Sequence, residues 1–272
     1  MNQNCIQIVP RAVGSNLRIL SWNILSEELT PGVPAIGERI DTVCGLLREY
    51  RPEAAGIQEI SEDGYRLFEE KISDTYTFVN PKTPAGNYSF TGIAYDHTVC
   101  RLLDSGIEVF PCGNIRIRIM NWVHLERIDD GVRFVLLSTH WDRHACNRPE
   151  QAALMAVRVK ELERRFADSP VISCGDFNAR ENSMAFHIFL QASGYREAKY
   201  LAAEPINNLF SGHNICDPNP QEDGNLSIDH IIVPDGTEVE HYEMLMRDDV
   251  ICASDHYPVY ADLKMKWATQ SE

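Results

Sequence analysis

Polar or ionisable groups stand at the ends of six short apolar, strand-like runs of this sequence. They are Asn23, Glu59, His140, Asp176 with Asn178, Asp229 with His230, and Asp255 with His256. In α/β sheets ligands bind outside the carboxyl ends of the strands, so groups from separate strand ends can meet. Each group alone is explained as well by a turn, a helix cap or a satisfied histidine. Chance does not account for all six together, and we predict that they form one site.

These residue types suit the hydrolysis of a phosphate ester with the help of a divalent metal. The oxygens of such an ester repel a nucleophile, so a hydrolase must neutralise charge, deprotonate a water and support the leaving oxygen. Mg²⁺ and Mn²⁺ prefer carboxylate and carbonyl oxygens, which Glu59, Asp255 and the amide of Asn23 can supply. A histidine beside a carboxylate can act as a base or as a charged phosphate ligand, according to its pKa.

The elements expected to position these groups begin as strand, helix, strand, helix. Residues 17–22 and 54–57 are predicted strands, and helical spacing of apolar residues follows each of them, over 36–50 and 63–72. Turn residues then separate a series of strand-like segments, which we expect to form an antiparallel meander. These segments are 90–95, 99–110, 115–127 and 132–139.

The second half of the chain returns to alternating helices and strands. We predict helices over 149–166 and 183–192, and strands over 171–174, 228–233 and 259–263. The sum is an α/β (α+β) architecture, with two mixed sheets packed face to face and helices outside. The stretches 80–89 and 207–227 are long and rich in turn residues, as functional or mobile loops are.

Composition limits the class of protein. With 272 residues, of which 44% are hydrophobic, the chain can bury one large core, so we expect a single domain over 1–272. Its formal net charge of −15 argues against a surface that binds long polyanions, although a metal can reverse the sign of an acidic pocket locally. Residues 1–13 do not resemble a signal peptide, and no apolar run is long enough to span a membrane. We expect a soluble, cytoplasmic monomer without a membrane anchor.

Eight cysteines are scattered along the chain without any CxxC pair, and several lie inside apolar runs. We expect buried, reduced thiols rather than a disulfide framework or a zinc site. The cysteines are Cys5, Cys44, Cys100, Cys112, Cys146, Cys174, Cys216 and Cys252.

The motifs around the strand ends resemble, in their order, those of the endonuclease/exonuclease/phosphatase superfamily, which has the deoxyribonuclease I-like fold. They are Ser21-Trp22-Asn23, Gln58-Glu59, Ser138-Thr139-His140, Gly175-Asp176-Phe177-Asn178, Ile228-Asp229-His230 and Ser254-Asp255-His256. The likeness spans about residues 17–263 and is specific as a set. It implies a four-layer sandwich of two mixed sheets flanked by helices, with a divalent metal, usually Mg²⁺, at the open end.

The resemblance also implies roles around the metal. Asn23 and Glu59 look like the metal-binding pair, with Glu59 the main ligand and Asp255 contributing directly or through a water. Asp229 resembles the carboxylate that orients and charges His256, which then binds the scissile phosphate or serves as base. Whether one metal or two are bound stays open.

The remaining roles implied by the resemblance concern the attacking water and the phosphate. Asp176 looks like the group that positions and deprotonates the water, and Asn178 like one that holds a phosphate oxygen. His140 resembles a histidine that donates to the phosphate. Either Asp176 or His256 could be the general base.

Residues 139–144 resemble the small bacterial branch of this superfamily, whose motif reads Thr-His-Phe-Asp-His. Here Trp141 replaces the Phe, and Arg143 precedes His144. A group of basic residues could form a cationic lip for a second phosphate, although a solvated strand face and helix surface explain them equally well. The group comprises Arg116, Arg118, Arg143, His144 and Arg148.

The leading interpretation is a metal-dependent phosphodiesterase of the nuclease type, with Mg²⁺ or Mn²⁺ as its cofactor. Its substrate would be a phosphate ester, and nucleic acids and nucleotides are candidates. A phosphomonoesterase acting on a sugar, inositol or nucleotide phosphate has the same residues. An interpretation of another class is a catalytically silent binding module of the same fold, suggested only by departures near Trp141 and Asn208.

Overall fold

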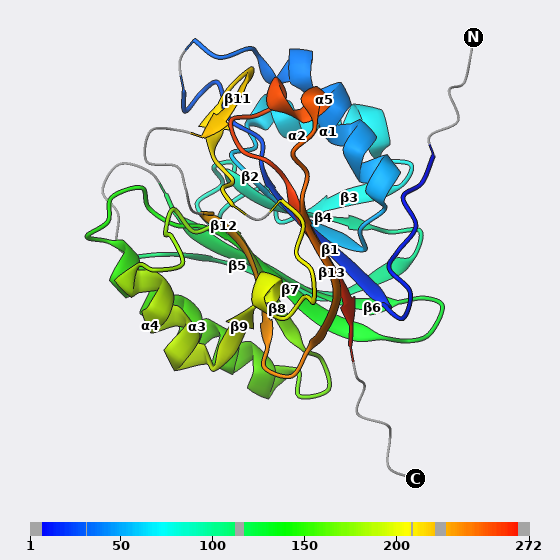
Figure 1. Ribbon diagram of the computed structural model, residues 1–272, viewed down its shortest axis with the longest axis vertical. Helices are drawn as coiled ribbons and strands as arrows, with labels where there is room; N and C mark the ends of the chain where they lie inside the picture. Colours follow the sequence, from blue (N-terminus) through cyan, green and yellow to red (C-terminus); the bar gives the residue numbers. More distant parts are fainter. Residues whose placement is uncertain (1–6, 31, 112–116, 208, 221–226, 266–272) are drawn as a thin grey trace.

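The computed structural model describes residues 7–30, 32–111, 117–207, 209–220 and 227–265. Two six-stranded mixed sheets lie between an upper layer of helices and a lower one (Figure 1). The expected four-layer α/β sandwich is therefore confirmed. In the described ranges, no helix is long and apolar enough to cross a membrane.

The first sheet has the strand order β13-β14-β1-β2-β4-β3. Its strands are β1 (Leu17–Asn23), β2 (Ala54–Gln58), β3 (Tyr76–Val79), β4 (Thr91–Asp96), β13 (Glu238–Met244) and β14 (Val259–Lys264). β1 and β2 are parallel, and Asn23 lies opposite Gln58, so both strands end at the same edge. Helices α1 (Ile36–Tyr50) and α2 (Glu62–Ile72) pack their apolar faces on this sheet.

The second sheet has the strand order β5-β6-β7-β8-β12-β9. Its strands are β5 (Cys100–Val109), β6 (Ile119–Arg127), β7 (Arg133–His140), β8 (Val171–Asp176), β9 (Tyr195–Glu197) and β12 (Asp229–Pro234). β7 and β8 are parallel, with His140 opposite Asp176, and the antiparallel β12 places Asp229 opposite Asp176 from the other side. Helices α3 (Arg148–Arg165) and α4 (Met184–Ser193) pack on this sheet.

The two sheets pack directly against each other through a central apolar layer. Small residues of β2 permit this close approach. A Cβ atom on Gly56 would lie 2.5 Å from Sγ of Cys174 and 2.8 Å from Oγ of Ser138, both on the opposite sheet. The strand ends of the two sheets are therefore held within reach of each other.

Two expectations about the elements were wrong. The segments expected as one meander are divided: β4 pairs with β2 and β3 in the first sheet, whereas β5, β6 and β7 form a ladder in the second. The stretch 207–227, expected as a loop, contains a hairpin of β10 (His213–Asn214) and β11 (Asp217–Pro220). A short helix, α5 (Asp248–Ile251), and a 3₁₀ turn, η1 (Ala198–Tyr200), complete the described elements.

Gly175 lies opposite Thr139 where β7 and β8 pair, directly before Asp176. Its φ is +145°, and a Cβ atom there would lie 2.0 Å from the carbonyl oxygen of Thr139. Real Cβ atoms do not approach backbone that closely, so the strand pair must move apart if Gly175 is replaced.

We expect Gly175→Ala to lower the free energy of unfolding by more than about 3 kcal/mol, because it forces a backbone clash inside a parallel strand pair. Gly236→Ala is the matched control: Gly236 also has a positive φ, of +83°, but no atom lies within 4 Å of the added Cβ. That variant should lose about 1 kcal/mol. Urea unfolding of both variants measures the difference, and equal losses would contradict the clash.

Candidate active site

Hydrogen bonds between side chains join the strand ends of the two sheets. The amide Nδ2 of Asn23, at the end of β1, donates to Oδ2 of Asp176, at the end of β8, over 3.1 Å. Nδ1 of His256, from the turn before β14, lies 2.7 Å from Oδ2 of Asp229 on β12. Each contact links the first sheet to the second, so the groups named from separate parts of the sequence lie at one edge of the sandwich.

The His256–Asp229 pair is almost completely buried. Asp229 is 0% and His256 7% exposed. Burial alone would lower the pKa of His256, but the contact with Asp229 and the charges of Asp255 and Asp176 raise this pKa well above its usual value. Because the carboxylate occupies Nδ1, Nε2 is the nitrogen left for a ligand.

Asp176 is buried at the start of a sharp turn. Its Oδ1 accepts the backbone N–H of Asn178 over 2.7 Å, and Asn178 adopts a left-handed conformation with a φ of +46°. Nε2 of His140 lies 3.2 Å from Oδ2 of Asp176. Burial alone would raise the pKa of Asp176, but the charges of His140 and His256 and these hydrogen bonds hold it well below its usual range. The turn thus keeps a carboxylate ionised in a buried position.

Glu59 follows β2 in a left-handed conformation, with a φ of +58°. Its N–H donates to the carbonyl of Phe90 over 2.7 Å, and its Oε2 accepts the N–H of Ser26 over 3.1 Å. Such a backbone conformation costs about 1–2 kcal/mol for a residue with a side chain, and functional sites are where it tends to be retained.

Glu59 and Asp255 fit a divalent cation. Burial and the charge of Glu59 raise the pKa of Asp255, against the opposing effect of His256. Among the described residues, Oδ1 of Asp255 is buried and has no hydrogen-bond partner. A cation between the two carboxylates would remove this repulsion and satisfy the orphaned oxygen.

The side chains that could hold a cation here are few. In the described part of the chain, no group of three or more His, Cys, Asp and Glu side chains could hold an ion. Mg²⁺ typically keeps several waters and binds one or two carboxylates. The amide oxygen of Asn23 already accepts the N–H of Leu25 over 3.0 Å, which leaves one lone pair for a metal or a water.

Arg39 is a site residue that the sequence interpretation missed. Its guanidinium is buried and donates to the carbonyl oxygens of Ile24, Leu25 and Ala253 over 2.5 to 2.6 Å. It therefore ties the turn after β1 to the turn that carries Asp255. The signal in the sequence was its place on the apolar face of the helix over 36–50.

The expectation of reduced thiols throughout was wrong for Cys216 and Cys252, which form a disulfide. Both are exposed, and their pairing could not be read from a spacing of 36 residues. Cys44, Cys100 and Cys174 are buried free thiols, as expected, and Cys146 is an exposed one. Cys5 and Cys112 lie outside the described residues.

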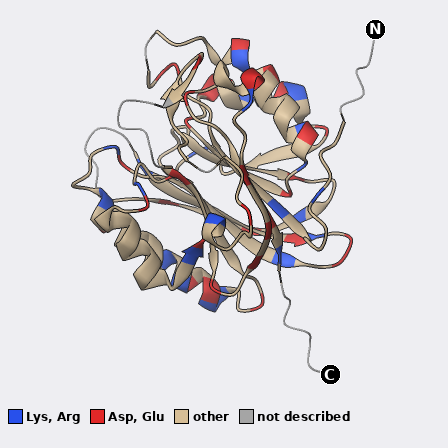
Figure 2. Cartoon of the chain, in the orientation of Figure 1, with Lys and Arg blue, Asp and Glu red and all other residues tan. Residues whose placement is uncertain are grey.

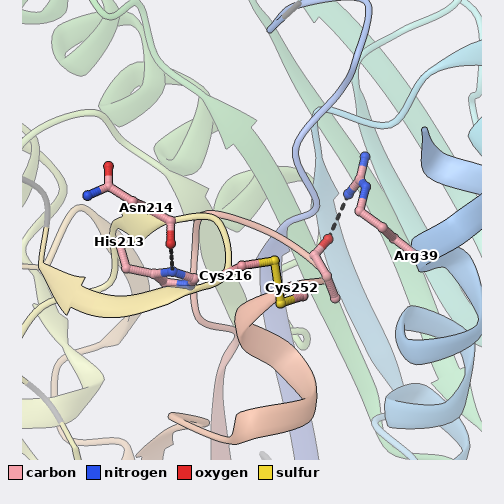
Figure 3. Close-up of a disulfide and its surroundings, with 6 residues drawn as sticks. Arg39, His213, Asn214, Cys216 and Cys252 are labelled. Atoms are coloured by element: carbon pink, nitrogen blue, oxygen red, sulfur yellow. Dashed lines mark hydrogen bonds between the residues drawn. A yellow bond between two sulfur atoms is a disulfide. The ribbon is translucent and has the colours of Figure 1, made fainter. Parts of the chain in front are cut away.

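The disulfide fastens the β10–β11 hairpin to the turn that carries Asp255 (Figure 3). The N–H of His213 donates to the carbonyl of Asp255 over 2.7 Å, and the N–H of Cys216 donates to the carbonyl of Ile251 over 2.9 Å. His213 is fully buried, and its pKa is lowered by burial and by the charge of His256, against the effect of Asp255. His213 is thus a second neighbour of the site that was not singled out from the sequence.

The residues expected to form a cationic lip differ in their exposure to solvent. Arg118 is buried, and its charge, with the His144 N–H and the Asn147 amide, lowers the pKa of Asp142 against the effect of burial. Arg143 and His144 are exposed on the loop after His140, and in the described ranges their side chains make no hydrogen bond or ion pair to the strand-end groups. Arg116 and Asn208 lie outside those ranges.

A sequence profile of the Endonuclease/Exonuclease/phosphatase family matches residues 20–256. The match begins within β1 and ends at His256, so it includes every strand end of the site. No curated protein is similar enough to this chain to count as a match.

Solved structures share the fold at low identity. A mannosyl-6-phosphatase of Bacteroides thetaiotaomicron is 22% identical, with a TM-score of 0.77 over 91% of this chain and 99% of that one. TDP2 of D. rerio, complexed with a single-strand DNA product, is 19% identical, with a TM-score of 0.72 over 90% and 97%. The catalytic domain of human nocturnin with a bound sulfate is 19% identical, with a TM-score of 0.71 over 91% and 93%.

We expect the disulfide to be detected directly as a linked peptide pair containing Cys216 and Cys252 in a non-reducing digest. Replacing both residues by Ser should lower the free energy of unfolding by up to about 4 kcal/mol, because the unfolded chain gains the entropy of an open 36-residue loop. Cys146→Ser, at an exposed free thiol, is the control and should change little. Free thiols at both positions in the non-reduced protein would contradict the pairing.

Proposed function

The chain belongs to the endonuclease/exonuclease/phosphatase family, and from this premise we propose that it is a divalent-metal-dependent phosphodiesterase. Proteins of this family generally hydrolyse phosphoester bonds and use divalent metals. The observation that carries the proposal is the pair of contacts across the sheets, Asn23 to Asp176 and His256 to Asp229. These contacts bring Asp176 and His256 to the same edge of the sandwich. They support a site in which both residues act on one phosphate, beside the carboxylates that would hold a metal.

Glu59 and Asp255 would hold Mg²⁺, or Mn²⁺ in its place. The amide oxygen of Asn23 would either bind the ion as a further ligand or accept a hydrogen bond from a water of the site. The ion, when bound, withdraws negative charge from the phosphate oxygens. The buried, unpartnered Oδ1 of Asp255 and the repulsion between Asp255 and Glu59 support this assignment.

Asp176 would accept the proton of the attacking water while the water oxygen forms its bond to phosphorus. Asn23, Asn178 and His140 hold this carboxylate through hydrogen bonds or close contacts of 2.7 to 3.2 Å. The orientation of the carboxylate is therefore fixed before substrate binds. The bond from phosphorus to the leaving oxygen breaks in the same step, and solvent returns a proton to that oxygen.

His256 would donate from Nε2 to a phosphate oxygen, because Asp229 occupies Nδ1. His140 and the amide of Asn178 would hold further oxygens. The sharp turn of Asn178 supports its part, because its amide Nδ2 already donates to the carbonyl of Trp141 over 2.9 Å and is thereby fixed beside Asp176.

The charge of the site favours a diester. A monoester carries close to two negative charges at neutral pH, whereas a diester carries one at its phosphate. The inner site holds more carboxylates than imidazoles, so a diester is repelled less. Its carboxylates are Glu59, Asp176, Asp229 and Asp255.

The substrate that we propose is a small or single-stranded diester, such as a nucleotide derivative or a short nucleic acid strand. The net charge is −15, and Figure 2 shows acidic and basic residues interspersed over the described elements in that view. A long duplex needs a basic track for its phosphates. Phosphomonoester hydrolysis is the second candidate, favoured by the likeness in fold to the mannosyl-6-phosphatase.

We propose a monomer without a membrane anchor. One observation argues against the cytoplasmic location that we expected from the sequence. The disulfide between Cys216 and Cys252 is exposed, and exposed disulfides persist in oxidising compartments rather than in a reducing cytosol.

We expect hydrolysis of bis(p-nitrophenyl) phosphate that requires added Mg²⁺ or Mn²⁺ and disappears with a chelator. Glu59→Ala and His256→Ala should each lower kcat/KM by about 10²–10⁴-fold, because each removes charge stabilisation from the transition state. Glu62→Ala is the control: Glu62 is an exposed carboxylate only three residues beyond Glu59 and should leave the rate unchanged.

A substrate panel separates the alternatives. It comprises p-nitrophenyl phosphate, sugar and inositol phosphates, nucleotides, poly(A) RNA, and plain and abasic DNA, each with and without Mg²⁺. Faster turnover of the monoesters would replace the diesterase by a phosphatase. The absence of metal-dependent hydrolysis across the whole panel would leave only a silent binding module.

A further inference from the structure

His230 is the one member of the strand-end set that the proposed reaction does not use. It follows Asp229 on β12, and its side chain is 0% exposed, so it cannot contact a substrate. Its ring packs against Phe186, with centroids 4.3 Å apart, and edge-on against Phe177 at 5.4 Å. A fully buried imidazole in this position needs partners for both of its nitrogens.

The two ring nitrogens of His230 face the backbone of Ala179 and the side chain of Glu197, and the contact with Glu197 is a short ion-pair distance rather than a formed hydrogen bond. Nε2 lies 2.9 Å from the Ala179 carbonyl oxygen, which can only accept, so Nε2 must carry a hydrogen. Nδ1 lies 3.0 Å from Oε2 of Glu197, at the end of β9, whose side chain is also 0% exposed. The Ala179 carbonyl thus fixes a hydrogen on Nε2, and a neutral ring then needs a donor at Nδ1, which a protonated Glu197 supplies; burial raises the pKa of that carboxyl group.

Ala179 ends the turn that begins with Asp176. Within that turn the Asn178 N–H donates to Asp176, and Asn178 takes the left-handed conformation described above. Lys199, two residues beyond Glu197, contacts Glu181 on the same loop. The segment formed by β9 and η1 thus holds the loop after β8 at two points, through His230 and through Lys199.

We propose that Glu197 and His230 form a buried positioning relay, which fixes the turn that aims Asp176 at the attacking water. The relay rests on the proposed function, since that function gives Asp176 its task. Both residues are positioning residues, because they act through the backbone carbonyl of Ala179 and touch no reacting atom.

The relay should govern the rate of the chemical step more than the binding of substrate. Asp176 must lie in line with the phosphorus only when water attacks, and a displacement of about 1 Å can cost about 10²-fold in rate. Asn178 is the phosphate-binding group that lies on this turn, whereas His256, Glu59 and Asp255 lie on other turns and keep their own supports.

The main variant is the double substitution Glu197→Leu with His230→Phe. Replacing both partners by apolar residues of similar volume avoids a lone buried charge. Such a charge would destabilise the whole protein and hide any specific effect on the turn. The Ala179 carbonyl then has no imidazole donor. We expect kcat to fall by about 10- to 100-fold, with KM changed by less than about threefold and a melting temperature near that of the original protein.

Glu197→Gln is the conservative variant. The glutamine amide can donate to Nδ1 of His230, which keeps the hydrogen on Nε2 and the bond to Ala179. It should therefore retain kcat within about threefold of the original protein, whereas Glu197→Leu alone should not. A merely space-filling role for Glu197 predicts the same kcat for both.

His124→Phe is the matched control for loss of a buried histidine. Nε2 of His124 lies 2.9 Å from Oγ of Ser169, and its ring lies 4.1 Å from that of Phe166. Ser169 precedes β8, at the opposite end of that strand from Asp176. This variant should lose stability but keep kcat.

A measurement without substrate keeps the relay and the proposed function separable. The Asn178 N–H should exchange with solvent at least about tenfold faster in the double variant, and not in His124→Phe, because its turn has lost a support. If the original protein hydrolyses no phosphate ester, the proposed function fails and exchange still tests the relay. A folded double variant with unchanged kcat and unchanged Asn178 exchange, or an equal loss of kcat in His124→Phe, would overturn the relay.

Discussion

The hydrogen bond from Asn23 to Asp176 is the contact on which the site depends, since it joins the ends of strands from two separate sheets. It forms only if the sheets pack closely, and Gly56 permits that approach. It also requires β7 and β8 to end level with each other, which Gly175 allows at the price of a left-handed φ. The geometry of the site therefore depends directly on the packing of the core. A change that separates the sheets moves every strand-end group at once.

Charge imposes the second constraint. Several carboxylates are held at one buried edge, where repulsion opposes folding unless each has a donor or a cation. Asp229 has His256, and Asp176 has three hydrogen-bonded or close neighbours, but Asp255 and Glu59 face each other's charge. The positive charge of the buried Arg39 offsets part of the repulsion between Asp255 and Glu59. A cation bound between these carboxylates would offset their repulsion, and it would then stabilise the folded state.

Much of this arrangement could be predicted from the sequence, because buried strands and amphipathic helices have local signals. The helix over 36–50 was predicted with the bounds that the structure has. The groups were predicted to meet outside the carboxyl ends of strands, which holds for β1, β2, β7 and β8. Asp229 instead opens β12, and Asp255 and His256 precede β14, because these two strands run antiparallel to their neighbours. β9 and β13 were missed because they are short or polar edge strands without a continuous apolar run. The disulfide and the bonds of Arg39 depend on how turns far apart in the chain approach each other, which no local pattern encodes.

Backbone conformation explains why functional groups cluster at these ends rather than along the strands. Left-handed conformations occur just after three strands: at Glu59, directly after β2, and at Leu25 and Asn178, two residues after the last residue of β1 and of β8. A left-handed residue turns the chain sharply, so a strand can end there and the side chains beside the turn stay at the edge of the sheet. This conformation costs about 1–2 kcal/mol for Leu25 and Glu59 and less for Asn178, and each turn is held by hydrogen bonds from neighbouring segments. The rigidity of the site thus comes from supports that lie behind it, in buried groups that no substrate reaches, of which His230 is one.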